Sequence, residues 1–278
     1  MAIRVMVNGL PGKMASEVAR AVYRSDDFRL ARFSFCSPRR KESFVPVDGV
    51  PFDVALVLPG QREDYILSTG EDDSWLVMVD YTRPDAVRGN VEFYCRHGCP
   101  FVLGTTGHDD RSALERLVQD SGNVAVIAPN MAKQIVAFQA MMQYAAENFP
   151  NSFAGYELEI KESHQQGKKD TSGTARAMAE DFNKLGIPFA VGQIRSVREP
   201  SEQLAMGIPE DALSGHGWHT YTLNSADGTV LFRFTHNVNG RSIYAEGTLS
   251  ALRFLQQKVD EGAQGRVFSM IDVLKSGF

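Results

Sequence analysis

Cysteine is scarce in this sequence, which has only Cys36, Cys95 and Cys99 among its 278 residues. An odd count without paired spacing excludes the disulfide framework of small secreted domains and favours a reducing compartment. With His97 between them, Cys95 and Cys99 still fall short of the four ligands that a structural zinc site uses. We therefore predict no bound metal.

Long apolar runs and an excess of basic residues are also missing. No stretch is long enough to cross a bilayer, and the N-terminus lacks the charged start, apolar run and cleavage site of a signal peptide (MAIRVMVNG). The formal net charge is −5, whereas a nucleic-acid-binding domain needs a basic face. We expect a soluble protein of the cytoplasm or an organelle interior that binds neither membrane nor nucleic acid.

The first 130 residues do contain a regular alternation of strand and helix patterns. Short apolar runs predict strands at 3–9, 28–36, 53–58, 74–82, 100–107 and 124–130. Stretches with helical spacing occur at 14–26, 85–98 and 108–122, the last with Asp109 or Asp110 as its N-cap. This alternation predicts an α/β fold with a Rossmann-like, doubly wound parallel sheet.

The pattern changes after residue 131. A long helix is predicted at 133–149, and the strand at 156–163 alternates apolar with charged residues. Another helix is predicted at 174–186, followed by strands at 192–199, 217–225 and 229–238 and a helical tail at 243–262. We predict a second, α+β domain over 132–239 with an open mixed sheet.

The first candidate site is the turn between the first strand and the first helix. Gly9 and Gly12 allow the backbone to turn sharply and to approach a pyrophosphate, which the helix N-terminus then attracts. Pro11 and Ala15 replace the second and third glycines of GxGxxG, so an ordinary strand–helix turn is the alternative. The position at the start of a βαβ series favours a nucleotide.

The residues after the second strand indicate which nucleotide binds. An NAD site usually has an acid there for the ribose 2′-hydroxyl, but this sequence has Cys36 and Ser37, followed by Arg39, Arg40 and Lys41. Guanidinium groups and a hydroxyl suit a 2′-phosphate. We predict NADPH as the preferred cofactor and NADH as the second; a solvated basic loop is the alternative.

The second candidate site is the stretch ESHQQGKKDTSGTA, residues 162–175. Ser172, Gly173 and Thr174 open a helix, and Lys168 and Lys169 precede them, so a carboxylate or phosphate suits this place. His164 adds a group that exchanges a proton near neutral pH. The alternative is a plain N-cap with solvated lysines and a structural histidine.

These segments together resemble the 4-hydroxy-tetrahydrodipicolinate reductases, also called dihydrodipicolinate reductases, and in particular their plant-type branch. The resemblance extends in family order over nearly the whole chain, through VNGLPGKM, VDYTRPDAV, PFVLGTTG, APNMAKQ, ESHQQGKKDTSGTA and HNVNGRSIYAEGT. It implies a dinucleotide-binding domain over 1–131 and 240–278, and a substrate-binding and oligomerisation domain over 132–239. It also implies NAD(P)H-dependent reduction of a cyclic imine dicarboxylate in lysine biosynthesis by a homo-oligomer, dimeric or tetrameric.

The resemblance assigns roles to individual residues. His164 and Lys168 match the catalytic pair, and Ser172, Gly173 and Thr174 match the loop that grips a substrate carboxylate, with Thr106 and Gln165 beside it. Gly104 and Thr106 would lie between nicotinamide and substrate, and Asn130 and Met131 at the domain junction. The full set of expected cofactor residues is Gly9, Gly12, Lys13, Met14, Ser37, Arg39, Arg40, Thr82, Arg83, Gly104, Thr106, Asn130 and Met131.

The sequence departs from the bacterial pattern at three positions. Gln165 replaces a second histidine, Thr171 replaces the proline before Ser-Gly-Thr, and Ala15 replaces a glycine. Glutamine donates and accepts hydrogen bonds but does not titrate. Two alternative functions therefore stay open, a different two-domain dehydrogenase acting on an amino acid or semialdehyde, and an NADPH-binding sensor without catalysis.

Overall fold

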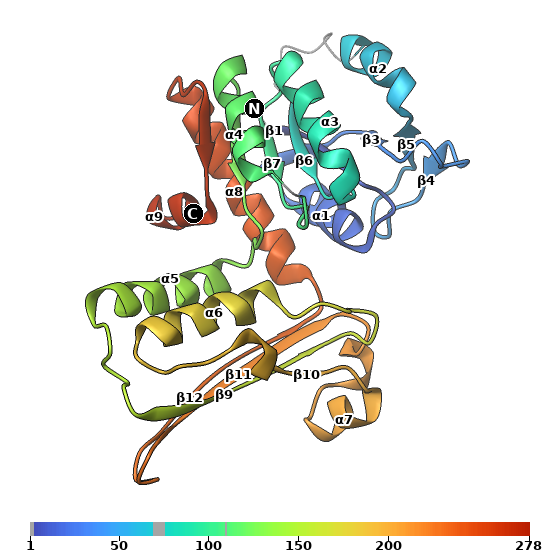
Figure 1. Cartoon of the computed structure of the whole chain (residues 1–278). Helices are drawn as coiled ribbons and strands as arrows, with labels where there is room; N and C mark the ends of the chain where they lie inside the picture. The colour runs from blue at the N-terminus through green and yellow to red at the C-terminus, as the bar shows by residue number, and fades with distance from the viewer. Residues whose placement is uncertain (1–2, 69–75, 109) are drawn as a thin grey trace. The chain divides into compact units, whose positions relative to one another are not determined.

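The computed structural model describes residues 3–68, 76–108 and 110–278, and it divides into two compact units (Figure 1). The first unit contains the chain up to Lys133 together with Ser242–Phe278, and the second contains Gln134–Arg241. Asp109, one of the two expected N-caps, and the expected start of a strand at 74–75 lie outside the described residues.

A six-stranded parallel sheet forms the centre of the first unit. Its spatial order is β13-β8-β7-β6-β1-β2, with neighbouring strands all parallel. Interior strand residues such as Val5, Met78 and Val102 are fully buried, as expected of a parallel sheet covered on both faces. This confirms the predicted Rossmann-like sheet. The strands are β1 (Ile3–Asn8), β2 (Phe28–Leu30), β6 (Leu76–Asp80), β7 (Phe101–Leu103), β8 (Val124–Ile127) and β13 (Arg266–Phe268).

Two pairs of helices pack with this sheet. α1 (Lys13–Arg24) contacts α8 (Ser242–Asp260), and α3 (Pro84–Arg96) contacts α4 (Arg111–Ser121), as Figure 1 shows. Asp110 is the N-cap of α4, because its carboxylate accepts a hydrogen bond from the amide of Ala113 at 2.8 Å. The short helices α2 (Arg62–Ser68) and α9 (Met270–Lys275) and the 3₁₀ turn η1 (Pro59–Gln61) were not predicted.

The strand predicted at 28–36 is wrong in one respect, because the segment forms two strands in two sheets. The Ala31 amide still donates to Val5 of β1 at 2.8 Å, whereas the Arg32 carbonyl already accepts from the Ala55 amide at 2.8 Å. The chain thus changes partners between these residues. Beyond this point β3 (Phe33–Phe35), β5 (Val54–Val57) and β4 (Phe44–Val45) form a separate three-stranded sheet.

The second unit is built on a four-stranded mixed sheet with the order β10-β9-β11-β12. β9 and β10 are parallel, and the other two pairs are antiparallel. The helices α5 and α6 lie along the sheet (Figure 1), and their apolar side chains pack against it. Exposed polar residues such as Glu157, Glu159 and Arg233 alternate along the strands, so the predicted open mixed sheet is confirmed. The elements are α5 (Lys133–Asn148), β9 (Tyr156–His164), α6 (Gly173–Lys184), β10 (Arg195–Val197), α7 (Pro200–Ala205), β11 (His216–Ser225) and β12 (Leu231–Asn239), with 3₁₀ turns η2 (Val191–Gln193) and η3 (Glu210–Ala212).

Among the helices in the described part of the chain, none combines the length and the apolar character that a membrane crossing requires.

Candidate functional site

The loop between β1 and α1 depends on its two glycines. Gly9 has a φ of +105°, and a Cβ there would lie 2.4 Å from the carbonyl oxygen of Tyr81, so no other residue fits without moving backbone. The Gly12 amide donates to the Gly9 carbonyl at 2.8 Å, and the Gly12 carbonyl accepts the first helical hydrogen bond from Ser16 at 2.8 Å. The remaining amides of the first turn have no acceptor within the helix and suit an anion.

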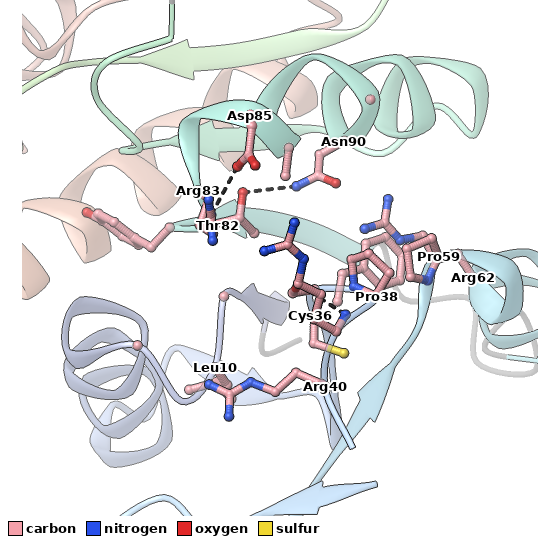
Figure 2. A pocket seen from close by; sticks show the side chains of 18 residues that line it. Leu10, Cys36, Pro38, Arg40, Pro59, Arg62, Thr82, Arg83, Asp85 and Asn90 are labelled. Carbon is pink, nitrogen blue, oxygen red and sulfur yellow. Dashed lines mark hydrogen bonds and ion pairs between the residues drawn. The ribbon is translucent and has the colours of Figure 1, made fainter. Parts of the chain in front are cut away.

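A cavity of about 710 Å³ adjoins this loop (Figure 2). A volume of this size is typical of small-molecule sites. Among the described residues, its wall contains four arginines, Arg39, Arg40, Arg62 and Arg83, and one carboxylate, Asp85, which is paired with Arg83 at 3.1 Å. The cavity therefore favours a ligand that carries negative charge.

Arg62 is a lining residue that the sequence analysis missed. Its guanidinium carbon lies 4.5 Å from the centre of the Phe35 ring, and its Nε is buried without a hydrogen-bond partner among the described residues. Burial lowers the pKa of the Arg62 guanidinium, although arginine keeps its proton in proteins. Because α2 was not predicted, no sequence signal connected Arg62 with the loop at 36–41.

Asp80, a buried residue at the end of β6, holds wall residues of the cavity in place by hydrogen bonds. One carboxylate oxygen accepts from the Thr82 amide at 2.9 Å, the Thr82 hydroxyl at 2.7 Å and the Thr105 hydroxyl at 3.1 Å. The other accepts from Asn90 and from the Tyr94 hydroxyl, both at 2.8 Å. Burial, followed by the charge of Asp80, raises the pKa of Tyr94 well above its ordinary value. The phenol therefore stays protonated and keeps donating.

The structure brings some of the expected cofactor residues together and leaves others apart. The wall of the cavity includes Gly9, Gly12, Ser37, Arg39, Arg40, Thr82 and Arg83. The wall as described does not include Lys13, Met14, Gly104, Thr106, Asn130 or Met131. Gly104 has a local reason to be glycine, since a Cβ there would lie 2.4 Å from the Tyr81 ring.

Glu162 lies at the centre of the second candidate site. It is fully buried, two residues before His164 on β9, so both side chains leave the same face of the strand. Its Oε1 accepts from the Ser196 hydroxyl at 2.7 Å and from the Arg198 guanidinium at 2.6 Å, and its Oε2 pairs with His164 Nδ1. Burial pushes the pKa of Glu162 upward, but the hydrogen bonds from His164, Arg198 and Ser196 outweigh burial and lower it to about 2.

Arg198 also holds the loop that carries Lys168. Its guanidinium donates to the carbonyl oxygens of Lys168 at 2.9 Å and Asp170 at 3.3 Å. The Lys168 amide donates to the Gln165 carbonyl at 2.9 Å, and the Lys168 ammonium pairs with Asp170 at 2.8 Å. The Lys168 side chain is 21% exposed and that of His164 is 16% exposed, so the two expected catalytic side chains both reach the surface of this unit.

Ser172 is the N-cap of α6, and Gly173 and Thr174 are the first two residues of the helix. The Ser172 hydroxyl accepts from the Ala175 amide at 3.5 Å and lies 2.9 Å from Nε2 of His219. His219 comes from β11, and its ring centre lies 5.1 Å from that of His164. The tertiary structure thus places a second histidine beside His164, although position 165 is glutamine.

Three further histidines of this unit are held neutral by burial. Burial lowers the pKa of His216, takes that of His219 well below its ordinary value, and lowers that of His236 to about 4. Ligand atoms of Glu162, His164 and His219 lie within 4.8 Å of one another, but the Arg198 guanidinium already occupies Glu162. This arrangement suits proton transfer better than a cation.

Comparison with known proteins identifies the family. The family profile for the N-terminus of dihydrodipicolinate reductase matches residues 3–131, and that for its C-terminus matches residues 134–274. A rice protein (Oryza sativa subsp. japonica), "Probable 4-hydroxy-tetrahydrodipicolinate reductase 2, chloroplastic", is 47% identical over 98% of this chain and 83% of its own length. The Arabidopsis thaliana "4-hydroxy-tetrahydrodipicolinate reductase 2, chloroplastic" is 46% identical over 99% of this chain and 78% of its own.

A solved structure agrees at the level of the fold. The dipicolinate-bound dihydrodipicolinate reductase of Paenisporosarcina sp. TG-14 superposes with a TM-score of 0.66 at 20% identity, covering 97% of this chain and 98% of that one. The two profiles account for almost the whole sequence, and the plant relatives align over nearly all of it. The chain therefore belongs to the dihydrodipicolinate reductase family.

Proposed function

We propose that this chain is an NAD(P)H-dependent 4-hydroxy-tetrahydrodipicolinate reductase of lysine biosynthesis by way of diaminopimelate. In the overall reaction, 4-hydroxy-tetrahydrodipicolinate, NAD(P)H and a proton give tetrahydrodipicolinate, NAD(P)⁺ and water. One observation carries the proposal, namely that buried Glu162 and half-buried Arg198 hold both His164 and the Lys168 loop. An acid–base group beside a cation and a helix N-terminus suits a substrate that carries two carboxylates and takes up a proton on its ring.

The first unit fits a dinucleotide on two counts. Gly9 and Gly12 allow a tight loop at the start of α1, since a Cβ at either would collide with backbone, and the buried Arg62 Nε lacks a partner among the described residues. A bound reduced nicotinamide supplies a hydride to the ring carbon of the substrate. We assign the pyrophosphate to the first-turn amides of α1 with Lys13 and Met14, and the nicotinamide side to Thr82, Arg83, Gly104, Thr106, Asn130 and Met131.

We further propose that NADPH is preferred over NADH, because Ser37, Arg39, Arg40 and Arg62 all line one cavity. Arg40→Ala should lower the ratio of kcat/KM for NADPH to that for NADH by tenfold or more, since a hydrogen bond to a charged group contributes about 1.5–3 kcal/mol. Arg88→Ala is the matched control, because this exposed arginine of α3 pairs with Glu92 outside the cavity wall. A wild-type preference for NADH, or an unchanged ratio in Arg40→Ala, would contradict the assignment.

In the second unit, we assign one substrate carboxylate to Lys168 and to the first-turn amides at Ser172, Gly173 and Thr174. Gln165 is assigned to orienting the ring by a hydrogen bond. His164 donates the proton that balances the incoming hydride. The Lys168 ammonium is paired with the exposed carboxylate of Asp170. Because an exposed ion pair contributes little free energy, a substrate carboxylate can replace Asp170 at little cost.

The test of the proposed reaction is turnover with the condensation product of pyruvate and aspartate semialdehyde, followed by loss of NADPH absorbance. Lys168→Ala should lower kcat/KM by about 100-fold, because the cation acts on both bound substrate and transition state. Lys169→Ala, which removes the neighbouring exposed lysine, should stay within about twofold. Tight NADPH binding without oxidation by the wild type would support a nucleotide sensor instead.

We also propose that the chain forms a homo-oligomer through the second unit. β12 is an edge strand of the mixed sheet. Its Leu231 is 56% exposed and its Phe232 is 40% exposed in the single chain, which is typical of a surface that contacts another protein copy. Sedimentation equilibrium at micromolar concentration should give a mass above 30.7 kDa, reduced in Leu231→Lys. A monomer under these conditions would contradict the proposal.

A further inference from the structure

We propose that Glu162 is a positioning residue for His164. Held by Arg198 and Ser196, its carboxylate keeps one proton on Nδ1 of the imidazole and so reserves Nε2 for exchanging a proton with the substrate. The inference rests on the proposed function, and it adds a residue that the expected catalytic pair does not include.

Both oxygens of Glu162 have fixed partners. Ser196 and Arg198, in and just after β10, donate to Oε1 at 2.7 and 2.6 Å, and this leaves Oε2 for His164 Nδ1. The carboxylate is fully buried, whereas the imidazole is 16% exposed. The acid is therefore fixed behind the ring, and the ring alone reaches solvent. A buried carboxylate on one imidazole nitrogen selects the tautomer and the orientation of the ring.

The second ring nitrogen faces a position without a side chain. Gly217 of β11 is the register partner of His164, and a Cβ at this position would lie 3.2 Å from Nε2. The hydrogen bonds of the described residues include none to His164 Nε2, although Gln203 fixes the backbone by donating to the His164 carbonyl at 2.7 Å. Nε2 is thus the atom from which a proton leaves.

Several titratable and charged groups face His164. The facing groups are Glu162 on β9, Arg198 after β10, His216 and His219 on β11, and His236 on β12. The three other histidines are neutral, since burial lowers the pKa of each, and Arg198 is compensated by its own contact with Glu162. Because Nδ1 is paired with the buried carboxylate of Glu162 and Nε2 is not hydrogen-bonded among the described residues, His164 gives up the proton on Nε2 during the reaction and keeps the one on Nδ1.

A purely structural role is the competing explanation, because Glu162 also ties β9 to β10 through Arg198. Such a role affects stability but not the pH at which His164 acts. Glu162→Gln separates the two, because the glutamine oxygen still accepts from Arg198 while its amide donates to Nδ1 and forces the remaining proton onto Nε2.

The first measurement is the pH profile of kcat/KM. In Glu162→Gln the shape of the profile should change, because the proton is forced onto Nε2, and kcat near pH 8 should drop at least tenfold. Glu159→Gln, which removes an exposed carboxylate from the same strand, should superimpose on the wild type. A Glu162→Gln profile with the wild-type shape, lowered uniformly or not at all, would overturn the proposal.

The second measurement needs neither a variant of Glu162 nor turnover. Ring ¹⁵N shifts of the histidine-labelled full chain, assigned with His164→Asn, report which nitrogen carries the proton. We expect a proton on Nδ1 of His164, strongly shifted downfield, even above about pH 8. A proton on Nε2 with a bare Nδ1 would refute the pairing. A chain without any turnover but with the Nδ1 proton would refute the proposed reaction and leave this pairing standing.

Discussion

At the scale of single residues, buried carboxylates organise both candidate sites. Asp80 and Glu162 are both fully buried, yet neither lacks hydrogen-bond donors. Asp80 receives its donors from three segments of the first unit, at Thr82, at Asn90 and Tyr94, and at Thr105. Such a network is stable only when every member is satisfied, so a change from acceptor to donor at its centre is costly.

Asp80→Asn tests this network. The amide group of asparagine would face donors, and one or two hydrogen bonds would be replaced by donor–donor contacts. We expect the free energy of unfolding in urea to fall by about 2–4 kcal/mol and NADPH binding, measured by calorimetry, to weaken with it. Asp48→Asn, at a side chain that is 90% exposed, should change stability by less than about 0.5 kcal/mol. Equal effects of the two changes would contradict the role of Asp80.

At the scale of elements, two helical glycines have opposite environments. Gly247 of α8 lies against the backbone after β8, and a Cβ there would be 1.7 Å from the Met131 carbonyl oxygen. Gly89 of α3 has nothing within 4 Å of its Cβ position. The close approach of α8 to residues 131–132 therefore depends on the missing side chain, whereas α3 would accept one.

These two glycines provide a matched pair of substitutions. Gly247→Ala should lower the free energy of unfolding by about 1–3 kcal/mol, because the backbone or the helix must move. Gly89→Ala should raise it by up to about 1 kcal/mol, since alanine is the better helix former. Urea denaturation of both variants measures the difference. Stabilisation by Gly247→Ala would show that α8 does not approach Met131 as described.

At the scale of the whole molecule, the buried and half-buried histidines of the second unit make stability depend on pH. His236 has a pKa of about 4 in the folded protein and about 6.5 when unfolded. Between these values the unfolded chain binds more protons than the folded protein. The contribution of His236 to the free energy of unfolding is therefore fully present above pH 6.5 and is lost as the pH decreases toward 4. His219, with a pKa far below its ordinary value because of burial, acts in the same direction.

We expect His236 alone to account for a loss of about 2 kcal/mol between pH 6.5 and pH 5. His236→Gln should reduce the slope of unfolding free energy against pH in this window, as measured by urea denaturation at several pH values. Above pH 7 His236 is neutral in both the folded and the unfolded protein, so the slopes of the wild type and of His236→Gln should agree. Parallel curves over the whole range would show that His236 is not buried as a neutral base.

The sequence by itself determined what depends on neighbours along the chain. Apolar periodicity predicted most strands of the parallel sheet and of the mixed sheet, although not β13. The N-cap of α4 was narrowed to Asp109 or Asp110, because the amide that Asp110 binds is only three residues away. The candidate site from His164 to Thr174 was predicted because its residues lie within one short segment of the sequence. The break of the strand at 28–36 was not predicted, because it depends on hydrogen bonds that Ala31 and Arg32 make with two different strands that are distant in the sequence.

Only the tertiary structure decided which distant residues complete each site. Arg62 reaches the wall of the arginine-lined cavity from a helix that the sequence pattern did not indicate. Arg198, just after β10, reaches Glu162, and His219 of β11 reaches His164. Glu162 belongs to the stretch at 162–175, but its importance comes from partners more than 30 residues away. Burial, which lowers the pKa of His219 and His236, is likewise a property of packed layers. Hydrogen bonds and desolvation act through space, so they become visible only once the chain has folded.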